Sequence, residues 1–109
     1  MKEIVELLAQ RRVLCRRLDR VEPRELGSRK RVEIFEGAAP DDYYCMVMVL
    51  RKKSRILQKE ARELLALHHK LEEKNGAKIK RCYLVIDAPF CSKAAAVLEG
   101  AGWKIFRIG

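Results

Sequence analysis

The longest apolar run in the chain covers residues 43–50 and reads Tyr-Tyr-Cys-Met-Val-Met-Val-Leu. Eight residues match the length of a buried strand, whereas a membrane-spanning helix needs about 20 apolar residues. Because successive side chains of a strand point to opposite faces of its sheet, a run that is apolar throughout has to be covered on both faces. The run therefore predicts a central strand with a packing layer on each side.

The second half of the chain alternates helices with apolar strands. A helix is predicted from about residue 54 to residue 74, ended by Asn75 and Gly76. A buried strand over residues 82–86, an alanine-rich helix from about residue 92 and a last strand over 103–108 follow. Strands separated by a helix pair in parallel, so this half predicts a parallel part of the sheet. The stripe of the first of these helices consists of Leu57, Ala61, Leu64, Leu65 and Leu71.

The first half predicts a hairpin behind a long helix. Residues 31–36 have the pattern of a strand, and residues 37–42 that of a turn into the central strand. Apolar residues at helical spacing predict one amphipathic helix over residues 1–22. We therefore expect one α/β domain over residues 1–109, with a mixed four-stranded sheet flanked by helices in the order α-β-β-α-β-α-β. Its β-β-α-β-α-β core is expected to cover residues 30–109.

Composition limits the cofactors and the location that we expect. The N-terminal residues lack the apolar segment of a signal peptide, which predicts a cytoplasmic protein with no membrane partner. No phosphate-binding loop and no dinucleotide-binding motif is present in the sequence, so no cofactor is predicted. The cysteines form no C-x-x-C pair, so we expect no metal site and interpret them as small buried apolar residues. They are Cys15, Cys45, Cys82 and Cys91.

Positive charge is strong and gathered in blocks. The chain has 24 Lys and Arg against 15 Asp and Glu, a net charge of +9, which favours an anionic partner, nucleic acid first. Phosphate backbones bind such clusters through counterion release, and the alternative is a solvated surface offset by glutamates, which we prefer for the helix at 54–74. Few aromatic residues interleave with the cations, so stacking on single strands is not expected. The predicted nucleic-acid-binding residues are Arg29, Lys30, Arg31, Arg51, Lys52, Lys53 and Arg55.

A few isolated residues carry chemistry of their own. His68 falls inside the apolar stripe of its helix, where a core residue with one satisfied ring nitrogen is expected rather than a base or a ligand. His69 lies at the edge of the stripe, and neither histidine has a cysteine or carboxylate at metal-ligand spacing. Cys91 opens a helix, which lowers a thiol pKa, but residues 91–97 contain no arginine or glycine and do not form a phosphatase cradle. Asp87 follows a parallel strand, where it serves a site or caps the turn before Pro89.

The order of elements resembles the core of the PD-(D/E)xK, or restriction-endonuclease-like, superfamily, and in particular its small archaeal members. The resemblance covers roughly residues 30–109 and implies a nuclease-like fold. It is carried by the helix at 61–65, its end at 73–76, the basic approach and strand at 80–86, and the segment 94–103.

The chemistry of that superfamily needs an acid near the first hairpin and an acid-x-Lys pair on the next strand, which together hold Mg²⁺. Asp41, after Pro40, resembles the first motif. The strand at 43–50 offers Met-Val-Leu at 48–50 where the second motif is expected, and apolar side chains do not bind Mg²⁺. The resemblance therefore implies a copy without hydrolysis, unless Glu36, Asp41 and Asp42 regroup.

Three functions follow in order of preference. The first is binding of a nucleic-acid backbone without catalysis. The second is a protein-interaction or self-assembly module, because the apolar stripe of the helix at 1–22 is wide enough to pair with a copy of itself. The third is a metal-dependent nuclease.

Overall fold

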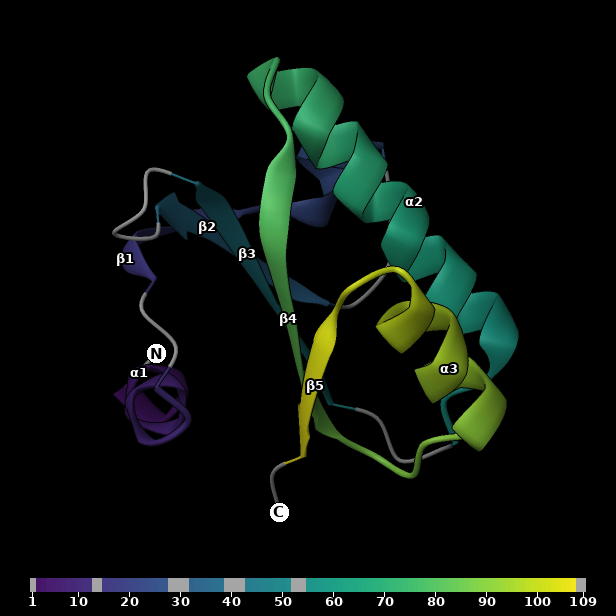
Figure 1. The fold of residues 1–109 in the computed structure, drawn as a ribbon. Helices are drawn as coiled ribbons and strands as arrows, with labels where there is room; N and C mark the ends of the chain where they lie inside the picture. The colour runs from purple at the N-terminus through teal and green to yellow at the C-terminus, as the bar shows by residue number, and fades with distance from the viewer. Residues whose placement is uncertain (1, 13–14, 28–31, 39–42, 52–54, 108–109) are drawn as a thin grey trace.

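The computed structural model describes residues 2–12, 15–27, 32–38, 43–51 and 55–107. Their strands form one mixed sheet in the order β1-β2-β3-β4-β5, antiparallel from β1 to β3 and parallel from β3 to β5 (Figure 1). The predicted α/β class is confirmed, with five strands in place of four. The elements are α1 (Lys2–Gln10), β1 (Arg16–Val21), the 3-10 helix η1 (Pro23–Leu26), β2 (Glu33–Ala38), β3 (Tyr44–Arg51), α2 (Gln58–Asn75), β4 (Ile79–Asp87), α3 (Ser92–Gly100) and β5 (Lys104–Arg107).

The extra strand comes from the region where a single helix over residues 1–22 was predicted, and that prediction is wrong. Helix α1 ends at Gln10, and Arg12 takes a left-handed conformation with φ 58°. Strand β1 then pairs with β2, with Val21 opposite Ile34, and buries Val21. Helical spacing over residues 4–18 misled the prediction because hydrogen bonding along the free edge of β2 outweighs local helix preference. The wide helical stripe behind the self-assembly hypothesis does not exist.

Strand β3 is the centre of the sheet, as its sequence predicts. Its residues from Cys45 to Leu50 are all buried. Met46, Met48 and Leu50 belong to the larger core, while Val47 and Val49 belong to a smaller core on the opposite face. Helices α2 and α3 lie on one face and α1 lies on the other (Figure 1).

Helix α2 packs against the larger core and leads the chain back to the start of β4. It buries Ala61, Leu64, Leu67 and Leu71. Leu57, which the predicted stripe included, is instead the exposed residue that precedes the helix. The predicted end is confirmed, since Gly76 adopts φ 65°, the left-handed conformation that glycine accepts without strain.

Both predicted β-α-β passages are present, and they bring the carboxyl ends of β3 and β4 together. In the parallel register of these strands Arg51 lies opposite Asp87. Just beyond, Ile56 forms a bridge with Phe90: Ile56 N–H donates to Pro89 O at 2.9 Å, and Cys91 N–H donates to Ile56 O at 3.1 Å. The segments that follow β3 and β4 are therefore held side by side.

Two of the four cysteines form a disulfide, which corrects the interpretation of all four as buried apolar thiols. Cys15 and Cys45 are bonded, with their Cα atoms 6.2 Å apart. Gly37, the register partner of Cys45, has no side chain to obstruct the link towards the β1 side. Cys82 is free and buried, as predicted, and Cys91 is free and half-buried. Among the described residues no helix has the length and apolar character needed to cross a membrane.

Candidate functional site

Two of the seven predicted nucleic-acid-binding residues fall in the described part of the chain, Arg51 and Arg55. Arg51 is the last residue of β3, Arg55 immediately precedes the bridge at Ile56, and both are exposed. The bridge places Arg55 beside the segment that leads into α3, so both arginines lie at the carboxyl ends of β3 and β4. The other five predicted residues, Arg29, Lys30, Arg31, Lys52 and Lys53, lie outside the described residues.

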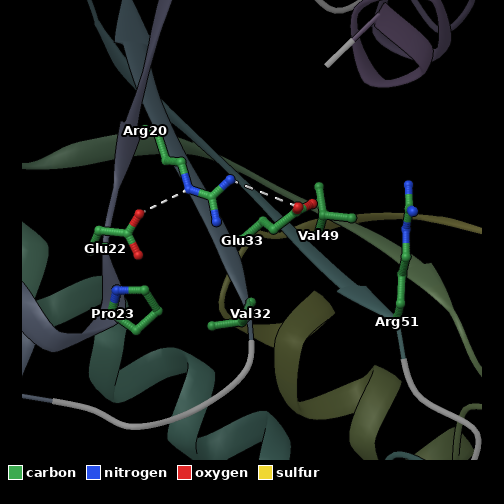
Figure 2. Close-up of a pocket in the computed structure, with 7 residues that line it drawn as sticks. All are labelled: Arg20, Glu22, Pro23, Val32, Glu33, Val49 and Arg51. Atoms are coloured by element: carbon green, nitrogen blue, oxygen red, sulfur yellow. Dashed lines mark hydrogen bonds and ion pairs between the residues drawn. The ribbon is translucent and has the colours of Figure 1, made fainter.

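Arg51 also borders an open hollow formed between β1, β2 and β3 (Figure 2). Its other charged residues come from three segments: Arg20 from β1, Glu22 from the approach to η1, and Glu33 from the start of β2. The hollow is lined by Arg20, Glu22, Pro23, Val32, Glu33, Val49 and Arg51.

The guanidinium of Arg20 pairs with both carboxylates of this hollow. Its Nε donates to Glu22 Oε1 at 3.1 Å, and its Nη1 lies 4.0 Å from Glu33 Oε1 (Figure 2). About half of each of these side chains is exposed, so the pairs contribute little to stability. Their effect is electrostatic: the single positive charge of Arg20 partly offsets the two carboxylates that line the hollow with Arg51.

The hollow does not fit the Mg²⁺ site that the superfamily resemblance implies. The register places Glu33 directly opposite Val49, which is apolar and buried. Strand β3 contains no acidic residue, and the residue two positions after Val49 is Arg51. Mg²⁺ takes oxygen ligands, and the two carboxylates present are already paired with Arg20. The acid-x-Lys pair that polarises water in that superfamily is not formed.

Among the acids that were considered as substitutes, Glu36 lies in the described part of the chain, and it does not line this hollow. Glu36 lies three residues further along β2, roughly 10 Å from Glu33 at about 3.3 Å per residue. It accepts a hydrogen bond from the Asn75 side chain and borders a second hollow with Arg17 and Asp19. Asp41 and Asp42 lie outside the described residues.

Cys91, at the start of α3, lies beside Arg55. Backbone N–H groups of Ala94 and Lys93 donate towards its sulfur and lower the pKa of the thiol, and the charge of Arg55 lowers it further. The sequence-based expectation of a lowered thiol pKa at this helix end is therefore supported. Asp87 is exposed and is the register partner of Arg51.

The histidines at the end of α2 lie close to groups that sequence reasoning did not associate with them. His68 Nε2 lies 2.9 Å from Ile79 O, which confirms a partly buried histidine with a satisfied ring nitrogen. The same nitrogen is 3.5 Å from Glu72 Oε2 and 3.3 Å from Cys82 Sγ. The statement that no cysteine or carboxylate accompanies the histidines is therefore wrong. The i, i+4 spacing of His68 and Glu72 was a visible signal, whereas Cys82 is brought in by the pairing of β4 with β3.

Two exposed cations near the start of β4, Lys80 and Arg81, lie beside an aromatic ring. Lys80 Nζ lies 4.7 Å and Arg81 Cζ 5.8 Å from the centre of the exposed Tyr43 ring. This cluster could not be predicted from local pattern, because Tyr43 is far from both cations along the chain. It lies at the amino-terminal ends of β3 and β4, away from Arg51 and Arg55.

The fold is similar to solved structures of restriction-endonuclease-like proteins. EndoMS in its apo form matches with a TM-score of 0.60 and 19% identity over 98% of this chain and 45% of that one. A repair endonuclease from Pyrococcus abyssi matches with a TM-score of 0.58 and 15% identity, over 98% of this chain and 46% of that one. A complex of EndoMS with dsDNA matches with a TM-score of 0.52 and 20% identity, over 98% of this chain and 43% of that one.

These similarities show the fold, and the chain spans less than half the length of each of these solved chains. The restriction-endonuclease-like fold that the sequence resemblance implies is confirmed. No protein-family model matches the sequence, and a search of curated proteins finds no match.

Proposed function

We propose that this protein binds the phosphate backbone of nucleic acid at the carboxyl ends of β3 and β4 and does not cleave it. The proposed contacts are Arg29, Lys30, Arg31, Arg51, Lys52, Lys53 and Arg55.

The proposal depends above all on the position of Arg51 and Arg55. The two exposed arginines lie at one end of the sheet, on a chain with a net charge of +9. Arg20 offsets the nearby carboxylates, so these acids repel an approaching phosphate less strongly. One neighbour of this fold was solved with dsDNA, which supports testing DNA first. Phosphate contacts of this kind give affinity and orientation without reading the bases.

The absence of catalysis rests on the hollow beside Arg51. Hydrolysis of a phosphodiester by this fold's usual chemistry requires a metal ion to polarise water. Val49 occupies the position opposite Glu33, and β3 supplies no carboxylate. Without an oxygen ligand from β3, the described residues of the hollow cannot assemble that metal site.

Fluorescence anisotropy with labelled duplex and single-stranded DNA, titrated at several salt concentrations, tests the binding. If about five phosphates are neutralised, log affinity for duplex falls against log salt with a slope of about −4 to −5. Replacing Arg51 and Arg55 together by alanine should reduce the steepness of the slope by about 2. A matched control replaces Lys70 and Lys78, two exposed cations near the amino-terminal end of β4, by alanine; it removes the same charge but should leave the slope unchanged.

Two results would contradict the proposal in different ways. Electrostatic affinity is strong at roughly 50 mM salt. If neither DNA binds there, the proposed binding is refuted. Cleavage that requires Mg²⁺ and is lost in Asp41→Ala or Asp42→Ala would leave binding intact and establish a nuclease.

A further inference from the structure

The end of α2 and the start of β4 bring four metal-binding donor groups together. His68, His69 and Glu72 each offer a donor atom, and these atoms all lie within 4.8 Å of one another. Cys82 adds its sulfur, 3.3 Å from His68 Nε2. The helix supplies three of these residues from about one turn, and the strand supplies the fourth.

Three of the separations between these donor atoms match the edges of a tetrahedral zinc site. With Zn–N of about 2.0–2.1 Å and Zn–S of about 2.3 Å, neighbouring donors in a tetrahedron lie roughly 3.3–3.6 Å apart. His68 Nε2 lies 3.3 Å from Cys82 Sγ and 3.5 Å from Glu72 Oε2. His69 Nδ1 lies 3.4 Å from Glu72 Oε1.

The burial of these groups suits a bound ion with one side open to water. The side chains of His68 and Glu72 are 13% and 19% exposed, and Cys82 is buried. His69 is 70% exposed, so its ring can turn towards an ion or leave that position to water. An open hollow beside His69 and Glu72, bordered by Gly76 and Lys78, gives an ion a path inwards.

The surrounding backbone already orients the carboxylate. Ile79 N–H donates to Glu72 Oε2 at 2.8 Å, which fixes the carboxylate beside the His68 ring. Hydrogen bonds of this kind to a ligating carboxylate are typical of the surroundings of protein metal sites. His68 Nε2 has room for a single proton but lies within 3.5 Å of Ile79 O, Cys82 Sγ and Glu72 Oε2. One proton can serve only one of these acceptors well, whereas a cation attracts the sulfur and the carboxylate together.

We propose that His68, Glu72, Cys82 and His69 form a binding site for a divalent cation of the zinc class. Nitrogen and sulfur donors favour zinc and similar ions, and they disfavour Mg²⁺ and Ca²⁺, which prefer all-oxygen sites. The thiolate and the carboxylate together balance the two positive charges of the ion. The bound ion links the end of α2 to β4, and it is separate from the arginines at the other end of these strands.

The competing explanation is a hydrogen-bond network without metal, in which His68 Nε2–H donates to Ile79 O. Metal binding replaces that hydrogen bond with a coordination bond, so the two explanations predict different responses to added ions. Trp103, the single tryptophan, provides a probe, because its ring centre lies 5.8 Å from that of His68. Co²⁺ in the site should quench its fluorescence.

The experiment uses the full chain with its disulfide intact, freed of metal by dialysis against a chelator and then titrated with Co²⁺ and Zn²⁺. We expect one equivalent of Co²⁺ to give the visible bands of tetrahedral cobalt and a thiolate-to-cobalt charge-transfer band in the near ultraviolet. Quenching of Trp103 should accompany these bands, and one equivalent of Zn²⁺ should abolish all three signals.

Two substitutions test the ligands and one serves as a control. Cys82→Ser should remove the charge-transfer band, and His68→Gln should weaken Zn²⁺ binding about 100-fold or more, roughly one ligand's share of a structural site. Cys91→Ser, which removes the other free thiol, should change neither signal. Circular dichroism of each variant checks that it is folded.

The proposal is overturned if the folded wild-type chain binds neither ion. It is also overturned if the cobalt spectrum lacks the thiolate band, or if binding survives unchanged in Cys82→Ser and His68→Gln. Either of the last two results would indicate adventitious binding that does not use His68 and Cys82.

Discussion

The two ends of strands β3 and β4 differ in how far their polar groups are exposed to solvent. At the carboxyl ends, Arg51, Asp87 and Arg55 are exposed. At the amino-terminal part of β4, His68, Glu72 and Cys82 are largely shielded, and Glu72 Oε2 and Cys82 Sγ lie 3.5 Å and 3.3 Å from His68 Nε2. The first end suits a large, loosely held polyanion, and the second suits a small ion held by direct bonds.

The two free cysteines show what this difference does to a single chemical group. Burial raises the pKa of the Cys82 thiol to about 12, and the charge of Glu72 raises it too. Cys91, with N–H groups of α3 aimed at its sulfur and Arg55 nearby, has a lowered pKa. The same side chain therefore loses its proton less readily at one end and more readily at the other.

The largest expected difference between the ends is in stability. Leu71→Ala, in the same turn of α2 as His68 and Glu72, removes a fully buried side chain and should lower the free energy of unfolding by about 2–5 kcal/mol. Arg51→Ala at the exposed end should change it by less than about 1 kcal/mol. Urea unfolding followed by circular dichroism measures both, and equal losses would mean that the two ends do not differ in packing.

The reactivity of the free cysteine should differ clearly between the two ends. At pH 8 in the presence of a chelator, iodoacetamide should label Cys91 about 100-fold or more faster than Cys82, because the thiolate is the nucleophile and burial also blocks access. Mass spectrometry of tryptic peptides over time gives both rates. Similar rates at the two positions would contradict the difference in environment.

The raised pKa of Cys82 also predicts that the free energy of unfolding falls at alkaline pH. An unfolded cysteine, with a pKa of 9.0, loses its proton before the folded one, whose pKa is about 12, so the stabilisation is complete below pH 9 and is lost as pH rises to about 12. The loss should be about 1.4 kcal/mol per pH unit above pH 9. The free energy of unfolding of Cys82→Ala, measured alongside wild type without metal, should lack this component, and parallel pH curves would refute the prediction.

The smallest effect concerns an exposed ion pair between the last turn of α2 and η1. Lys74 Nζ donates to Glu25 Oε1 at 2.9 Å and is the largest cause of the lowered pKa of that carboxyl, joined by a backbone hydrogen bond at Glu22. Its stabilisation is present above the unfolded pKa of about 4.5 and is lost as pH falls through the folded value. In Lys74→Met the pKa of Glu25, followed by NMR, should rise; an unchanged pKa would show that the pair is not formed in solution.

Much of the fold could be predicted from local pattern. The run at 43–50 identified the central strand, because a strand that is apolar on both faces has to be buried on both. Asn75 and Gly76 marked the end of α2, since the left-handed turn there requires glycine. The two helices between apolar strands gave the parallel half of the sheet. The absence of an acid on β3 was equally visible, because it depends on residue identity alone.

The candidate sites were harder to predict from the sequence, because each depends on residues that are distant along the chain. Arg20 meets Glu33 only because β1 joins the sheet, and helical spacing over residues 4–18 concealed that strand. Cys15 bonds to Cys45 across 30 residues for the same reason. Cys82 reaches His68 because the register of β4 and the packing of α2 bring the two together.

By itself, then, the amino-acid order determined the α/β class, the buried central strand, the net positive charge and the lack of an acid on β3, since each follows from a residue and its near neighbours. Only the tertiary structure decided which charges neutralise one another and which donor atoms meet. Those outcomes depend on strand register and on distances of 3–4 Å between side chains up to tens of residues apart, to which local preferences are blind.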